Sequence, residues 1–141
     1  MKAALREYSV DGFVAVAIAA PQIGISKRIF LIDDQSKERD DRLPSIVAIN
    51  PSFTKLSKKT HLVGEGCLSV PDYYGEVKRA TNVTLHALDE HGEEFERGAG
   101  GLLAQIFQHE YDHLDGILFT DRAEKLWHKD ELEKSKREAD V

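Results

Sequence analysis

The chain has 141 residues, of which 41% are hydrophobic, and this is enough for one domain with a buried core. Its net charge of -6 offers no basic surface for nucleic acid, and no apolar run approaches the roughly 20 residues of a membrane span. Residues 1–7 lack the apolar stretch of a secretory signal peptide, and a single cysteine permits no internal disulfide bond. We therefore expect a cytoplasmic protein that binds neither membranes nor nucleic acid directly.

The first part of the chain is predicted to form mainly strands. A buried strand is expected over residues 27–33, and a charged loop follows over residues 34–43. Further strands are expected over residues 45–50, 75–79, 83–88 and 93–97. The last two of these are separated by a turn at residues 89–92, so they are expected to pair as a hairpin.

Helices are predicted in the last part of the chain. A central helix is expected over residues 102–113, ending near Gly116. Residues 122–141 form a C-terminal segment that is expected to be helical over residues 124–139. Together these elements predict one α+β domain, residues 1–141, in which antiparallel β-sheets pack around the central helix and a C-terminal helix follows.

The central helix contains the run Gln108-His109-Glu110-Tyr111-Asp112-His113, an H-E-x-x-H pattern. Residues four apart lie on one face of a helix, so His109 and His113 can bind a single divalent metal. Glu110 can then take a proton from a water on that metal. The flanking residues are apolar, as a buried helix requires; they are Leu102, Leu103, Ile106, Phe107, Leu114, Ile117, Leu118 and Phe119. The pattern therefore predicts a hydrolytic metal site.

A complete site needs a third protein ligand. Metzincin proteases have a third histidine where this chain has Phe119, which cannot bind metal. Thermolysin-like proteases use a downstream glutamate, and three are present in a charge-rich stretch typical of a solvated helix face; they are Glu124, Glu131 and Glu133. Cys67, in a turn-like segment at residues 65–71, is the stronger candidate, although a lone cysteine is often only a small buried hydrophobe.

Three ordered segments resemble the motifs of the peptide deformylase family, whose members remove the formyl group from the N-terminal formylmethionine of new bacterial and organellar proteins. Residues 65–69 match the motif E-G-C-L-S, and residues 108–113 match Q-H-E-x-D-H at every fixed position. Residues 15–22 correspond to G-x-G-x-A-A-x-Q, with Ala15 and Ala17 in place of both glycines. The resemblance extends to about residue 121 and so covers most of the chain.

The resemblance implies a role for each residue of the site. Cys67, His109 and His113 would hold the metal, natively ferrous iron and often zinc, nickel or cobalt after handling. Glu110 would be the general base and later the proton donor to the departing amine. The donors to the formyl oxygen, as it becomes an oxyanion, would be the side-chain amide of Gln22 and the backbone N–H of Leu68.

The resemblance also implies a peptide substrate, the N-formylmethionyl end of a nascent chain. Residues near the pocket for the methionine side chain would be Val16, Ala17, Gly66, Leu102 and Ile106. Glu65 would accept a hydrogen bond from a ligand histidine and fix its tautomer, with Arg79 as its partner. Some bacterial deformylases dock at the ribosome through a C-terminal helix; here the balanced charges from residue 122 onward favour a solvated helix and, at most, a transient ribosome contact.

Two departures from the family pattern lead to an alternative function. Ala15 and Ala17 each add a methyl group to a strand expected beside the bound peptide. Only fourteen residues precede Ala15, where family members usually have a strand and a helix, and a missing helix would uncover apolar surface. We expect an active metal-dependent deformylase; the alternative is a deformylase-like protein with an intact metal site and little or no turnover. A small metalloprotease is less favoured.

Overall fold

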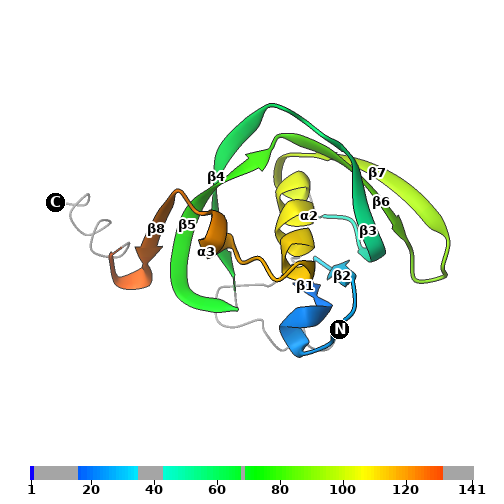
Figure 1. Ribbon diagram of the computed structural model, residues 1–141, viewed down its shortest axis with the longest axis horizontal. Coiled ribbons are helices and arrows are strands. Elements are labelled where there is room, and N and C mark those ends of the chain that lie inside the picture. Colours follow the sequence, from blue (N-terminus) through cyan, green and yellow to red (C-terminus); the bar gives the residue numbers. More distant parts are fainter. Residues whose placement is uncertain (2–15, 35–42, 68, 132–141) are drawn as a thin grey trace.

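The computed structural model describes residues 1, 16–34, 43–67 and 69–131, which form two antiparallel sheets with one long helix between them (Figure 1). The larger sheet has the strand order β1-β2-β3-β6-β7, and the smaller has the order β4-β5-β8. The predicted α+β class with antiparallel sheets is confirmed. The elements are β1 (Ala17–Ala19), η1 (Ala20–Ile23), β2 (Ile29–Ile32), β3 (Ile46–Leu56), β4 (Thr60–Cys67), β5 (Val70–Ala80), β6 (Asn82–Leu88), β7 (Glu94–Gly100), α2 (Gly101–Leu114), α3 (Phe119–Arg122) and β8 (Lys125–His128).

Helix α2 lies within one residue of its predicted bounds, because its apolar residues recur at helical spacing. Its buried face carries Ala104, Ile106 and Phe107, which join the core cluster on the larger sheet. Phe107 is fully buried, and its ring centroid lies 6.0 Å from that of Phe30 on β2. Full burial of such a side chain contributes about 1.5–3 kcal/mol to folding, so this packing fixes the helix against the sheet.

The end of α2 follows a common glycine motif. Gly116 has a φ of 73°, which only glycine adopts readily, and its N–H donates to the carbonyl of His113. The N–H of Ile117 donates to the carbonyl of Asp112 at 2.8 Å. These bonds satisfy the last carbonyls of the helix and turn the chain toward α3. None of the described helices has the length and apolar character that crossing a bilayer requires.

Strands β2, β6 and β7 and the hairpin turn between β6 and β7 are confirmed, but three strand predictions were wrong. Strand β5 was predicted over residues 75–79, yet it begins at Val70 and ends at Ala80. Strand β3 was predicted to end at Asn50, yet it continues to Leu56 through a register shift between Ile49 and Ser52. The shift accommodates Asn50 at a φ of 50°. Strand β4 was not predicted at all, because most of its residues are half-buried or exposed and show no strong strand pattern. Its pairing with β5 stabilises it as a strand.

The C-terminal segment also differs from its prediction. Residues 125–128 were expected to be helical, but they form strand β8, which pairs with β5 in the register Tyr73↔His128 to Glu76↔Lys125. Pairing with β5 therefore overrides the local helical preference. Residues 129–131 are helical, and residues 132–141 of the expected helix lie outside the described residues.

Gly75 on β5 allows this pairing. A Cβ at Gly75 would lie 2.7 Å from the carbonyl oxygen of Lys125, 3.1 Å from the Cβ of Ala123 and 3.4 Å from the Phe119 ring. The N–H of Glu124 donates to the carbonyl of Glu76 at 2.8 Å. The absence of a side chain at Gly75 thus lets α3 and β8 close on the smaller sheet.

Candidate metal centre

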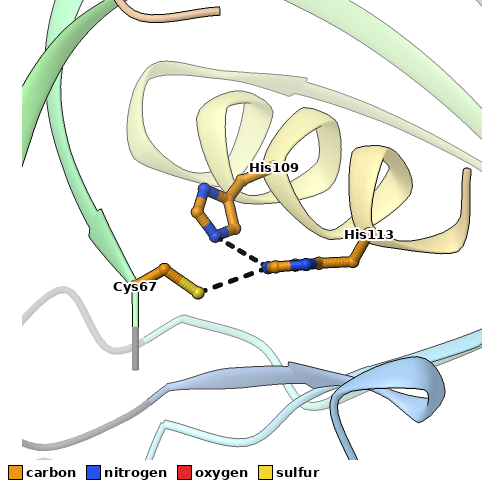
Figure 2. A group of neighbouring side chains, drawn as sticks. All are labelled: Cys67, His109 and His113. Atoms are coloured by element: carbon orange, nitrogen blue, oxygen red, sulfur yellow. Dashed lines mark hydrogen bonds between the residues drawn. The ribbon is translucent and has the colours of Figure 1, made fainter. Parts of the chain in front are cut away.

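Cys67, His109 and His113 converge from two elements (Figure 2). The histidines lie one turn apart on α2, and Cys67 is the last residue of β4, immediately before the turn into β5. The Nε2 atom of His113 lies 3.3 Å from Sγ of Cys67 and 3.2 Å from Nε2 of His109. All three donor atoms lie within 4.8 Å of one another. Elements far apart in sequence therefore present one sulfur and two nitrogens to a common point.

The spacing of these atoms fits a tetrahedral metal ion. Metal–nitrogen distances of about 2.05 Å and a metal–sulfur distance of about 2.3 Å place neighbouring ligand atoms roughly 3.3–3.6 Å apart. The separations of 3.2 Å and 3.3 Å around His113 are close to these values. Three protein ligands leave one position for water or substrate, as in catalytic rather than structural sites.

The surroundings of Cys67 favour its ionised form. Burial raises the pKa of Cys67, but the contacts with His109 and His113 outweigh burial and lower that pKa to about 5. Burial lowers the pKa of His109, whereas its hydrogen bonds with Cys67 and Glu65 raise that pKa to about 10. The thiolate is the form of cysteine that binds metal, so Cys67 is prepared for ligation at neutral pH.

The alternative third ligands lie in other surroundings. Phe119 is buried, and its ring stacks on that of His109, with centroids 6.4 Å apart and an angle of 22° between the planes. Glu124 lies 3.3 Å from Nζ of Lys78, and Glu131 is exposed. Glu133 lies outside the described residues. Cys67 is thus the residue that the fold brings to the two histidines.

Glu65 lies next to the candidate metal ligands and contacts one of them. Its Oε1 atom accepts a hydrogen bond at 2.7 Å from Nδ1 of His109, which leaves Nε2 of His109 facing Nε2 of His113. Arg79 donates to both oxygens of Glu65, from Nε and Nη2, each at 2.7 Å. Burial raises the pKa of Glu65, but these bonds outweigh it and lower that pKa to about 2. The carboxylate is therefore ionised whenever the protein is folded near neutral pH.

The contacts around Glu65 and Arg79 extend to residues to which the sequence assigned no role. Asp112 accepts a hydrogen bond at 2.7 Å from Nη1 of Arg79, and Arg122 donates to both oxygens of Asp112. The Gln108 side chain accepts from the N–H of Ala80 and donates to its carbonyl, so it fastens α2 to the end of β5. Asp112 and Gln108 were visible as fixed positions of the third motif, whereas Arg122 had no signal beyond its charge.

Glu110, the next residue of the motif, is buried and has one carboxylate oxygen that no described residue contacts by a hydrogen bond. It is 4% exposed, and among the described residues no hydrogen-bond partner reaches its Oε2 atom. Burial raises the pKa of Glu110 to about 7, against a smaller lowering effect of His109 and His113. A carboxyl group that titrates near neutral pH can both accept and return a proton.

Gln22 and Leu68 were predicted to donate to an oxyanion. Oε1 of Gln22 accepts a hydrogen bond at 2.7 Å from the N–H of Ala19, which fixes the orientation of the amide. Its Nε2 atom then lies 3.6 Å from Sγ of Cys67 and donates to Oγ of Ser69 at 3.0 Å. Leu68 lies outside the described residues. The amide donor of Gln22 is thus aligned next to Cys67.

The five residues expected near a methionine pocket fall into two groups. Val16, Ala17 and Ile106 belong to or pack against the same apolar cluster. Leu102 is 45% exposed at the start of α2. Gly66 lies under the ring of Tyr74, because a Cβ there would approach two ring carbons to 2.9 Å. The structure therefore places three of the five in one apolar cluster, whereas Leu102 and Gly66 are exposed.

Comparison with known proteins gives a consistent result. The family model described as polypeptide deformylase matches residues 1–129. A peptide deformylase of Chromohalobacter salexigens is 46% identical over 106 residues, which are 75% of this chain and 60% of that protein. One of Rhizobium meliloti is 44% identical over 111 residues, which are 79% of this chain and 63% of that protein. The chain thus spans about 60% of the length of these relatives.

Solved structures show the same likeness. A peptide deformylase from Synechococcus elongatus in complex with actinonin is 40% identical, with a TM-score of 0.70 over 79% of this chain and 57% of that one. A class I type b peptide deformylase from Acinetobacter baumannii with Met-Ala-Ser bound is 42% identical, with a TM-score of 0.70 over 77% of this chain and 70% of that one. The chain therefore belongs to the polypeptide deformylase family.

Proposed function

We propose that the protein is a metal-dependent peptide deformylase, which hydrolyses the N-formyl group of formylmethionyl peptides and releases formate. The observation that carries this proposal is the buried Oε2 of Glu110, which has no hydrogen-bond partner among the described residues and lies one residue from a member of the Cys67-His109-His113 set. A protein that only binds metal has no use for such a carboxyl group, which costs about 1–3 kcal/mol to leave unsatisfied. The cytoplasm, where nascent peptides are made, is the expected place of action.

The metal itself follows from the donor set. Cys67, His109 and His113 would hold one divalent ion, and we propose ferrous iron, with zinc, nickel or cobalt as substitutes. When bound, the ion would act as a Lewis acid and lower the pKa of water toward about 7. Glu65 holds His109 in the tautomer that this binding requires.

Glu110 would move the protons of the reaction. Its ionised form takes the proton of the attacking water at Oε2 as that water adds to the formyl carbon. The same carboxyl group then delivers the proton to the amine nitrogen of methionine as the C–N bond breaks. A pKa of about 7 suits both transfers, because neither protonation state is then strongly favoured.

Gln22 would stabilise the charge that forms on the formyl oxygen. Its Oε1 is engaged by the N–H of Ala19, so its Nε2 is already aimed beside Cys67 when substrate arrives. Donors fixed in this way need not reorient during the reaction. One such donor lowers the activation free energy by about 3–4 kcal/mol. The backbone N–H of Leu68 would be a second donor.

The substrate would be a peptide with formylmethionine at its N-terminus. The Met-Ala-Ser peptide in the Acinetobacter baumannii structure supports this class of ligand. We assign the methionine pocket to the apolar surroundings of Val16, Ala17 and Ile106, with Gly66 and Leu102 nearer its rim. A transient contact with the ribosome would involve the C-terminal segment, of which residues 132–141 lie outside the described part.

The test is formate release from formyl-Met-Ala-Ser by protein purified without oxygen and loaded with iron or nickel. Turnover should fall by about 10²–10⁴-fold in Glu110→Gln while one metal ion per chain stays bound. Metal binding without turnover in the unaltered protein would overturn the proposal and support the non-catalytic alternative. Turnover that persists in Glu110→Gln would show that another group moves the proton.

A further inference from the structure

Arg122, at the end of α3, is connected to a proposed metal ligand through three intervening side chains. Its Nε and Nη2 atoms donate to Oδ2 and Oδ1 of Asp112 at 2.7 Å and 3.0 Å. Asp112 accepts from Arg79, Arg79 holds Glu65, and Glu65 accepts from Nδ1 of the His109 ring, each at 2.7 Å. The path therefore runs from a surface arginine to an imidazole without a gap.

Among the arginines and carboxylates of this path, Arg122 supplies the second positive charge. Glu65, Arg79 and Asp112 have side chains that are at most 9% exposed, whereas the side chain of Arg122 is 46% exposed. Two guanidinium groups face two carboxylates. Without Arg122, both carboxylates would compete for the single guanidinium of Arg79, and Oδ1 of Asp112 would lose its protein donor.

Helix α3 contacts the same imidazole by a second route. Phe119 and Arg122 lie three positions apart, so they share one face of this short helical turn. The ring of Phe119 stacks on His109, and Arg122 forms a hydrogen-bonded ion pair with Asp112 on α2. Both contacts come from a segment that contributes no metal ligand among the described residues.

We propose that Arg122 is a positioning residue, which holds Asp112 so that Arg79 stays on Glu65 and Glu65 keeps the His109 ring in the orientation that binds metal. This inference rests on the proposed metal centre and deepens it. The simpler interpretation is that Arg122 only fastens α3 to α2. The two differ in one respect: fastening changes the stability of the protein, whereas positioning changes the metal affinity of the folded protein.

Arg28 offers a matched control. Its Nη1 atom lies 2.8 Å from Oδ1 of Asp115, which follows the same helix α2, and the two side chains are 41% and 42% exposed. Arg28→Gln therefore removes an arginine that is about as exposed as Arg122 and also pairs with an aspartate at the end of α2, although Asp115 is more exposed than Asp112. Among the described residues, the Arg28 side chain contacts Leu114, Asp115 and the Tyr111 ring, and none of these contacts reaches Glu65 or a proposed metal ligand. The control therefore reports stability alone.

The experiment measures Co²⁺ binding to Arg122→Gln, Arg122→Lys and Arg28→Gln by competition with a chelator, together with the visible absorption of bound Co²⁺. Partners that orient metal-binding histidines typically change affinity by 10–100-fold, and Arg122 acts at greater distance. We expect a Kd for Co²⁺ about tenfold higher in Arg122→Gln and unchanged in Arg28→Gln. The ligand-field bands should shift in Arg122→Gln as the His109 ring turns, with the sulfur-to-cobalt band retained.

Arg122→Lys returns the charge but not the two-pronged geometry, so its Kd should lie between those of the unaltered protein and Arg122→Gln. Equal Co²⁺ affinity in Arg122→Gln and Arg28→Gln would overturn the proposal. If Arg122→Gln does not fold, Arg122→Lys decides: an affinity equal to that of Arg28→Gln overturns it as well. Because Co²⁺ alone is the probe, a failure of formate release would count against the proposed function and not against this role of Arg122.

Discussion

The Nδ1 atom of His109 lies 2.7 Å from Oε1 of Glu65, and this contact decides which nitrogen of His109 faces His113. Arg79 holds Glu65 in turn by two hydrogen bonds. The orientation of the ring is therefore set by a buried ion pair on the neighbouring sheet rather than by α2 alone.

Substitution of Glu65 by glutamine should weaken metal binding. The amide can accept from His109, but it cannot balance the buried charge of Arg79, so the pair is broken from one side. We expect a Kd for Zn²⁺ or Co²⁺ that rises by 10–100-fold and a loss of about 3–5 kcal/mol in the free energy of unfolding. Chelator competition and urea unfolding measure the two effects.

The control for Glu65→Gln is Glu124→Gln, which removes an exposed carboxylate 3.3 Å from Lys78. That pair should contribute about 0–1 kcal/mol and leave metal affinity unchanged. An unaltered metal affinity in Glu65→Gln would show that the ring of His109 needs no carboxylate.

Substitution of Gln22 by alanine should slow the reaction without disturbing the metal. Its Nε2 donor lies beside Cys67, yet Gln22 is not among the three grouped donors. We expect kcat to fall by about 10²–10³-fold, with the metal content unchanged. Gln105→Ala removes a glutamine that donates to the carbonyl of Gly64 and serves as the matched control. A normal kcat in Gln22→Ala would leave the oxyanion to other donors.

Substitution of Cys67 by serine should remove the stabilisation that metal gives. A ligand that binds only the folded protein stabilises it by about 2.7 kcal/mol at 100 times its Kd. The unaltered protein should therefore show a higher Tm with Co²⁺ than with a chelator, and Cys67→Ser should show no difference. His128→Gln, which alters a histidine outside the donor set, should behave as the unaltered protein. A full Co²⁺ shift in Cys67→Ser would indicate a different third ligand, as in a metalloprotease.

The hairpin between β6 and β7 predicts a small acid dependence of stability. The N–H groups of Glu93 and His91 donate to Oδ1 of Asp89 and lower the pKa of that carboxyl below 3.8. A lowered folded pKa gives stability that is present above 3.8 and is lost as the pH falls through the folded value. Asp89→Asn should remove this part of the pH dependence, which urea unfolding between neutral and acid pH measures. A midpoint at or above 3.8 for Asp89 in an NMR titration would contradict it.

The sequence predicted what depends on nearby residues and missed what depends on distant partners. Helix α2 and the placing of His109 and His113 follow from spacing along one helix. Strands β4 and β8 exist because each pairs with β5, and neither shows a strong pattern of its own. Arg122 lies in a charge-rich segment, where the sequence alone does not distinguish a solvated arginine from one that donates to a buried aspartate.

Gly75 is a position at which the fold has no room for a side chain, although the residue takes no part in the chemistry. A methyl group there would lie 2.7 Å from the backbone carbonyl oxygen of Lys125. Backbone atoms cannot move aside as the end of a flexible side chain can. Strand β8 would have to slide or detach, and α3 would be carried with it. A mutational scan for lost metal affinity should therefore identify this glycine, a residue with no side chain, alongside the ligands themselves.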